Sequence, residues 1–204
     1  MTSDVDELTA ALSRQARFTG QVCLPHLRAE RERIAVYPTH ILGEPTSDGD
    51  AWLPDSMREL AAAFDGGRLF HAVYPHPEFG ELEMTGVSVF SLAEVATHTR
   101  KFRARYDDND WLRTLFVIGC NSSGDLFVAD QNGDDSLGDC AVHFLDHEEF
   151  FVCTPGYSQP IAESVFAFVL EVATNPLPYV AGWRHFDDEG EQYYVESVDF
   201  VDHR

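Results

Sequence analysis

Apolar residues recur every three or four positions in four stretches of the chain, a spacing that places them on one face of a helix. In the second stretch the apolar face begins at Met57, Pro54 suits the first turn, and Gly66 can end the helix. Ser3 and Ser91 are each followed three residues later by an acid, which is typical of a helix start. The sequence therefore predicts helices at about 3–19, 54–65, 91–106 and 161–174.

Between these helices, short β-prone runs alternate with turn residues. Strands are expected at 34–37, 69–72 and 87–90, and several more between Trp111 and Val152, where turns at 121–124 and 132–133 separate them. The segment from Tyr179 to Val201 is typical of a terminal hairpin. This order predicts an α+β fold in a single domain, 1–204, with a central sheet, antiparallel or mixed, that is flanked by helices.

Large apolar residues in these elements are expected to form the core. A chain of 204 residues with 44% hydrophobic content is long enough to bury one without disulfides or metals. The residues expected to be buried are Phe64, Trp111, Phe116, Ile118, Phe127, Val165 and Phe168.

The charge of the chain is strongly acidic. Fourteen basic and 35 acidic residues give a formal net charge of −21. Such a surface repels nucleic acid and anionic lipid, whose binding depends on Lys and Arg, and it attracts basic proteins. The charge therefore favours a basic protein partner, with solubility alone as the alternative explanation.

The cysteines and the N-terminal sequence favour the cytoplasm. Cys23, Cys120, Cys140 and Cys153 form no C-x-x-C pair, and the first residues lack the basic and apolar regions of a signal peptide. No uninterrupted apolar stretch approaches the length of a membrane span. We expect reduced thiols and a cytoplasmic location.

One motif resembles a metal site only in part, and the usual zinc and phosphate motifs are missing from the sequence. Asp130, Asn132 and Asp134 have the spacing that begins a calcium loop, but its sixth and twelfth positions hold Asp135 and Ala141 instead of glycine and glutamate. The histidines form no H-E-x-x-H motif, and no glycine-rich phosphate-binding motif is present. No metal and no cofactor are therefore expected.

Two further groups could carry acid–base or nucleophilic chemistry. Asp146, His147 and Glu148 are consecutive, and on a strand they would point to alternate faces, which favours a structural or interface role. Cys120 with His143 could form a thiol nucleophile and its base, but no known cysteine motif surrounds them. Catalytic residues are therefore not assigned, and the chain is not expected to be an enzyme.

Several short motifs occur in an order that resembles the SUKH superfamily. They are Leu53-Pro54 with Gly66-Gly67, Trp111 with Ile118-Gly119, Gly124-Asp125, Asp146-His147, and Ser164 with Phe166. The resemblance covers about 53–173 and implies a central antiparallel sheet, with an N-terminal helix and a C-terminal hairpin as extensions. The superfamily is best known for bacterial immunity proteins that neutralise toxins.

The resemblance and the charge together predict a protein-binding module, an immunity protein whose acidic surface meets a basic toxin such as a nuclease. A regulatory scaffold of the same superfamily and, less favoured, a hydrolase are the alternatives. Acids in turns are the best candidates for partner contact because binding residues concentrate on exposed loops. These candidates are Asp107, Asp108, Asp110, Asp134, Asp135 and Asp139.

Overall fold

The computed structural model describes residues 2–13, 16–21, 33–36, 39–76, 80–121, 124–131, 140–147, 160–174, 185–186, 192–193 and 198–200. Within them the helices are α1 (Thr2–Leu12), α2 (Asp55–Ala63), α3 (Leu92–Arg105) and α4 (Val165–Thr174), with a 3-10 turn, η1 (Leu112–Thr114). The strands, in chain order, are β1 (Ala16–Gln21), β2 (Arg33–Val36), β3 (Thr39–Leu42), β4 (Gly67–His76), β5 (Gly80–Val89), β6 (Leu115–Asn121), β7 (Leu126–Asp130), β8 (Ala141–Leu145), β9 (His185–Phe186), β10 (Gln192–Tyr193) and β11 (Val198–Phe200).

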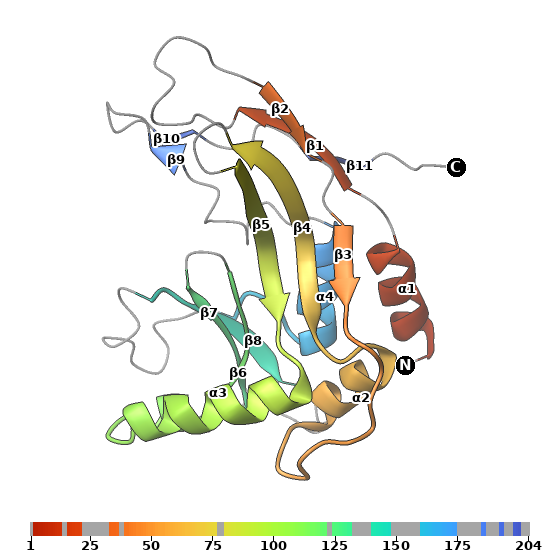
Figure 1. Cartoon of the computed structure of the whole chain (residues 1–204). Helices are drawn as coiled ribbons and strands as arrows, with labels where there is room; N and C mark the ends of the chain where they lie inside the picture. Colours follow the sequence, from red (N-terminus) through yellow and green to blue (C-terminus); the bar gives the residue numbers. More distant parts are fainter. Residues whose placement is uncertain are drawn as a thin grey trace.

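The main sheet has six strands in the order β3-β4-β5-β6-β7-β8. Every neighbouring pair is antiparallel, so the predicted α+β fold with an antiparallel sheet is confirmed. β4 and β5 pair along their whole length, whereas β5 and β6 pair over only three positions, from Val87↔Asn121 to Val89↔Gly119. The hairpin β4–β5 and the strands β6–β8 therefore diverge from a common region (Figure 1).

Gly119 lies at the point where β6 meets β5. A Cβ atom at this position would lie 2.4 Å from the backbone oxygen of Ser88, closer than real Cβ atoms approach another atom. Only glycine lets the two strands come this close. The glycine thus sets the place at which the two halves of the sheet join.

Helices cover the sheet from two directions. α1 and α2 both contact α4, and together they bury the larger core, which includes Phe116, Ile118 and Phe127. α3 packs on β6 and helps to bury a second cluster around Phe102 and Trp111. In Figure 1 α4 lies behind β3 and β4, and α3 crosses one end of β6 to β8.

The predicted core is confirmed. Its members belong to the two buried clusters, and each is at most 8% exposed. They are Phe64, Trp111, Phe116, Ile118, Phe127, Val165 and Phe168.

The prediction for the first helix is wrong in its extent. α1 ends at Leu12 instead of near residue 19, and the chain forms β1 from Ala16. β1 pairs with β2 on one side and with β11 on the other, so pairing with distant segments overrides the local helical pattern. Ser3 lies within α1 rather than before it.

The predicted capping box of the third helix is confirmed, whereas the role of Gly66 is different from the expected one. The Ser91 side chain accepts from the Glu94 backbone, and the Glu94 side chain accepts from the Ser91 backbone. α2 ends at Ala63, with an extended Phe64 as its cap, before Gly66 is reached. Gly66 has φ +76°, and a Cβ there would lie 2.5 Å from the Ser91 nitrogen, so it lets the start of β4 pass beside α3.

The environments of Trp111 and His71 become clear only in the structure. Trp111 precedes a 3-10 turn rather than lying in a strand, because the Asn109 side chain accepts hydrogen bonds from the backbone nitrogens of Trp111 and Leu112. His71, within the strand expected at 69–72, lies in β4 with 8% exposure, and its Nδ1 is 3.1 Å from the Thr85 hydroxyl.

The C-terminal segment contributes to two small sheets. β9 and β10 pair antiparallel as expected for a terminal hairpin, whereas β11 pairs with β1 through Ala16↔Phe200. Segments from opposite ends of the chain thus lie side by side. Among the described residues, no helix has the length and apolar character needed to cross a lipid bilayer.

Candidate functional sites

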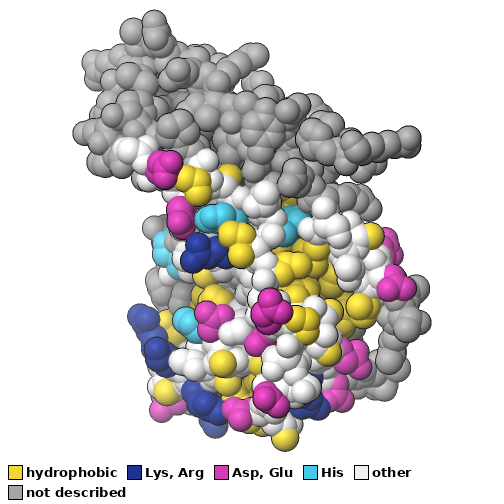
Figure 2. Space-filling model, turned by 45° about the vertical axis from the view of Figure 1, so that its right-hand side comes forward, with side chains coloured by type: hydrophobic (Ala, Val, Ile, Leu, Met, Phe, Trp, Pro, Cys, Tyr) yellow, Lys and Arg dark blue, Asp and Glu magenta, His cyan; other side chains and the backbone are white. Residues whose placement is uncertain are grey.

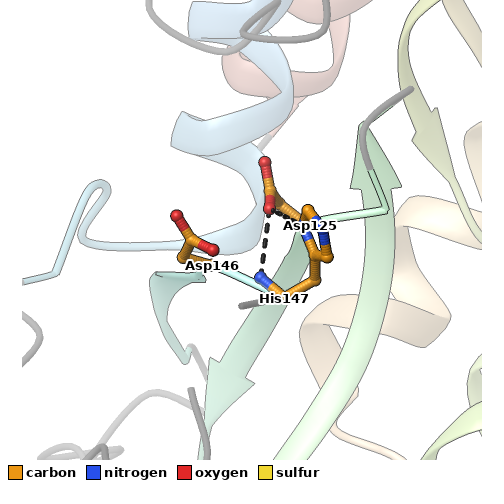
Figure 3. A group of neighbouring side chains, drawn as sticks. All are labelled: Asp125, Asp146 and His147. Carbon is orange, nitrogen blue, oxygen red and sulfur yellow. Dashed lines mark hydrogen bonds and ion pairs between the residues drawn. The ribbon is translucent and has the colours of Figure 1, made fainter. Parts of the chain in front are cut away.

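Asp125 links the start of β7 to the chain that follows β8. It lies just before β7, and His147 lies just after β8 (Figure 3). The Asp125 Oδ1 atom accepts from the backbone nitrogen of His147 at 3.1 Å and from its ring Nδ1 at 2.7 Å. The other carboxylate oxygen accepts from the Asn121 side-chain amide at 2.7 Å, and the Asn121 amide oxygen accepts from the Asp125 backbone. We call these three residues the Asp125 clamp.

The hydrogen bonds of the clamp outweigh the cost of burying a carboxylate. Burial alone would raise the pKa of Asp125, but the hydrogen bonds from His147 and Asn121 lower it below its usual value. The carboxylate is therefore ionised at neutral pH and fully engaged in the fold. This geometry agrees with a structural role for the Asp146–His147 motif.

Asp146 lies close enough to this pair to be considered with it. One ligand atom each from Asp125, Asp146 and His147 lies within 4.8 Å of the others. The expectation that residues 146 and 147 diverge is wrong, because β8 ends at Leu145 and the alternation of a strand no longer applies. Two carboxylates and an imidazole are suitable ligands for a divalent cation, but in this arrangement Asp125 accepts three hydrogen bonds, which favours the clamp over a metal cage.

The start of the calcium-like motif has a structural role of its own. One Asp130 carboxylate oxygen accepts from the Trp111 indole at 3.0 Å, and the other accepts from the Thr114 hydroxyl at 3.2 Å. These bonds attach the end of β7 to η1. Asn132 and Asp134 lie outside the described residues.

The thiol and the imidazole of the hydrolase hypothesis are not brought together. Cys120 on β6 pairs with Leu126 on β7. His143 lies on β8 and pairs with Val128, which follows Leu126 by two residues on β7. Strands lie about 4.8 Å apart, so roughly 10 Å or more separates the two residues. Burial and the nearby Glu94 charge raise the pKa of Cys120, which keeps its thiol protonated and weakly nucleophilic.

Three of the predicted partner-binding acids lie in one exposed turn after α3. Asp107, Asp108 and Asp110 are all exposed, and the Asp110 Oδ1 atom lies 3.9 Å from the Arg113 Nη1 atom. The other three, Asp134, Asp135 and Asp139, lie outside the described residues. On the face shown in Figure 2, acidic side chains are scattered across the described surface rather than gathered in one patch.

A cleft that sequence reasoning does not identify lies between the chain before α2, the end of α3 and β6. It has a volume of about 480 Å³, and we call it the Trp52 cleft. The residues that line it include Trp52, Arg58, Arg103, Phe116, Gln131 and Cys140. Such a volume falls in the range of sites for small molecules.

Aromatic rings and guanidinium groups form the wall of the Trp52 cleft. The rings of Trp52 and Phe116 stack at 5.6 Å with an interplanar angle of 25°. The Arg103 guanidinium carbon lies 4.4 Å from the centre of the Phe116 ring and 5.7 Å from that of Trp52. Arg58 donates to the backbone oxygens of Leu53 and Ala51, at 2.7 and 3.2 Å, which fixes the chain that carries Trp52.

A weak signal for Arg103 is present in the sequence. It lies four residues after Thr99 and seven after Ala96, both of which are buried, so it falls at the border of the buried face of α3. The sequence interpretation of Arg100 to Arg105 as cations that complement a helix end did not separate Arg103 from its neighbours.

No family model, curated protein or solved structure with which the chain was compared matches the chain.

Proposed function

We propose that this protein is a protein-binding module of the immunity type, which neutralises a basic toxin through an acidic surface. The order of motifs that resembles the SUKH superfamily and the net charge of −21 support the proposal. The antiparallel sheet with flanking helices is compatible with that resemblance. A charge of this sign and size accelerates the encounter with a basic partner.

The exposed turn of Asp107, Asp108 and Asp110 is the observation that carries the proposal. It directly follows the C-terminus of α3, where the helix dipole favours cations and disfavours carboxylates. Three carboxylates at this place do not stabilise the helix, so contact with a partner is a better explanation of their position. They would form charge-assisted hydrogen bonds with Lys and Arg side chains of the toxin.

A regulatory scaffold with a non-toxin partner would use the same acidic surface and is the second candidate. The hydrolase alternative has less support, because Cys120 and His143 lie far apart and the Cys120 pKa is raised. An enzyme of that type needs the thiol and its base within hydrogen-bond reach.

The candidate partners are proteins that are encoded by genes adjacent to this one and that have more Lys and Arg than Asp and Glu. Association of each purified candidate with this protein is followed by biolayer interferometry at low salt, and co-expression tests whether growth is rescued. We expect the triple variant Asp107→Asn, Asp108→Asn, Asp110→Asn to associate roughly tenfold more slowly than the wild type. Growth rescue separates a toxin partner from a scaffold partner.

A matched variant removes the same charge elsewhere. Asp6→Asn, Glu7→Gln and Glu59→Gln neutralise three exposed acids on α1 and α2. Their combined variant should associate nearly as fast as the wild type. Equal slowing by both triple variants would show that only net charge matters, and failure of every basic neighbour to bind would contradict the proposal.

A further inference from the structure

Arg103 carries a half-buried positive charge that no carboxylate in the described part of the chain neutralises. Arg58, Arg68, Arg100 and Arg113 each form an ion pair with an acid, whereas Arg103 forms none there. Burial lowers the pKa of Arg103, which reflects the cost of keeping its charge away from water. In a chain with 35 acidic residues, a cation at this depth without a carboxylate is an unusual arrangement.

The hydrogen-bond partners of Arg103 leave part of its guanidinium available. Nε donates to the Leu115 backbone oxygen at 3.1 Å and Nη2 donates to that of Thr114 at 3.2 Å. A guanidinium has five N–H donors, so these bonds use two and leave three, all on the two terminal nitrogens. The edge formed by Nη1 and Nη2 can pair with both oxygens of a carboxylate.

The walls around Arg103 determine which anions fit. Trp52 and Phe116 provide stacked rings, and Arg58 adds a second guanidinium that is already paired with Asp55. The indole nitrogen of Trp52 donates to the Asp50 carboxylate at 3.0 Å, and Arg100 donates to the same carboxylate at 2.5 Å. These bonds hold the Trp52 ring in place. Rigid aromatic walls bind an apolar or aromatic body, and the cation binds its charge.

We propose that the Trp52 cleft is a binding site for a small aromatic carboxylate, whose charge pairs with Arg103 and whose ring packs on Trp52, the ring that Phe116 supports from the core. This activity is separate from the acidic partner surface and requires no protein partner. The carboxylate at the end of a partner chain has the same chemistry, and the probes below separate the two sources.

Benzoate is the first probe and neutral benzamide, which has nearly the same shape, is its control. The ¹H–¹⁵N signal of the Trp52 indole, assigned with the Trp52→Phe variant, reports binding in the intact protein. Benzoate should shift this signal saturably, and benzamide should bind at least tenfold more weakly. N-acetyl-phenylalanine, compared with its amide, tests a chain-terminal carboxylate; if it binds more tightly than benzoate, the chain end is the source.

Arg103→Gln should weaken benzoate binding at least tenfold, which corresponds to about 1.4 kcal/mol. Arg105→Gln removes the same charge from the same helix outside the cleft and should leave the affinity unchanged. Equal binding of benzoate and benzamide, or equal affinity in wild type and Arg103→Gln, would overturn the proposal, as would the absence of a saturable shift. Should Arg103→Gln fail to fold, the comparison of benzoate with benzamide in the wild type decides. These measurements are independent of any toxin, so their failure is distinct from that of the immunity function.

Discussion

At the scale of single residues, His40 and Phe70 form an unusual pair. Phe70 is buried in β4 yet has φ +57°, a left-handed conformation that costs free energy in residues other than glycine. Its backbone nitrogen donates to Nδ1 of the His40 ring at 3.3 Å, and the two rings meet edge to face at 5.0 Å. His40 must be neutral at Nδ1 to accept this bond, which makes the pair sensitive to pH.

The first prediction concerns this pH dependence. Burial lowers the pKa of His40 from 6.5 to about 4. Because the folded-state pKa is the lower one, His40 contributes stability that is complete above pH 6.5 and is lost as the pH falls towards 4. Between these two pH values the free energy of unfolding should fall by about 3 kcal/mol. The free energy of unfolding in urea, measured from pH 7 to pH 4, should fall less in His40→Asn, whose amide oxygen can accept without titrating. The same pH dependence in both proteins would contradict the assignment.

A second prediction at this scale tests the Asp125 clamp. Asp125→Asn replaces an acceptor of three hydrogen bonds and should cost roughly 1–3 kcal/mol of unfolding free energy at pH 7. The lowered pKa of Asp125 means that this contribution is present above pH 3.8 and is lost as the pH falls through the folded value. The difference from the wild type should therefore shrink below about pH 4. Exposed Asp146→Asn is the control; a cost as large as that of Asp125→Asn would show that Asp146 also supports the fold.

At the scale of elements, β6 connects the core, the cleft and the two halves of the sheet. Phe116 on this strand is 1% exposed, packs in the larger core and also faces Trp52 and Arg103. Gly119, three residues on, allows the close contact with β5. One short strand thus supports both packing and the proposed ligand site.

Phe116→Ala tests this role of β6. The substitution leaves a cavity in the core and should reduce the free energy of unfolding by ~3–5 kcal/mol. Ile41→Ala, at a position 48% exposed on the edge strand β3, should cost far less. Chemical denaturation of the three proteins measures both differences, and a loss below about 1 kcal/mol for Phe116→Ala would mean that β6 does not form part of the core.

At the scale of the whole molecule, the net charge of −21 acts over distances longer than any single contact. Charge reversal of Asp134 and Asp135 to lysine should slow association with the basic partner and flatten its salt dependence, while stability stays nearly unchanged. Association rates at low and high salt measure the effect. Identical rates in the variant and the wild type would remove these two residues from the partner surface.

The sequence by itself determined the features that depend on neighbouring residues. The existence of the three later helices, the Ser91 capping box and the burial of residues such as Phe116 and Phe168 follow from periodicity, capping and hydrophobicity. The start of α4 does not: it lies at Val165 instead of Ile161, because Ala162 forms a bridge with Val142 of β8. The acidic turn after α3 is visible in the chain as written. These signals act within one or two turns of a helix or along one strand, so no tertiary contact is needed to detect them.

Only the tertiary structure decided which distant residues meet. The bond between His40 and Phe70 joins positions 30 apart, and the one between Asp125 and His147 joins positions 22 apart. β1 became a strand because β2 and β11 pair with it, and Arg103 became part of a cleft because α3 packs beside Trp52 and Phe116. Local periodicity contains no information about such partners, since the register of strands and the packing of helices are set by the whole chain.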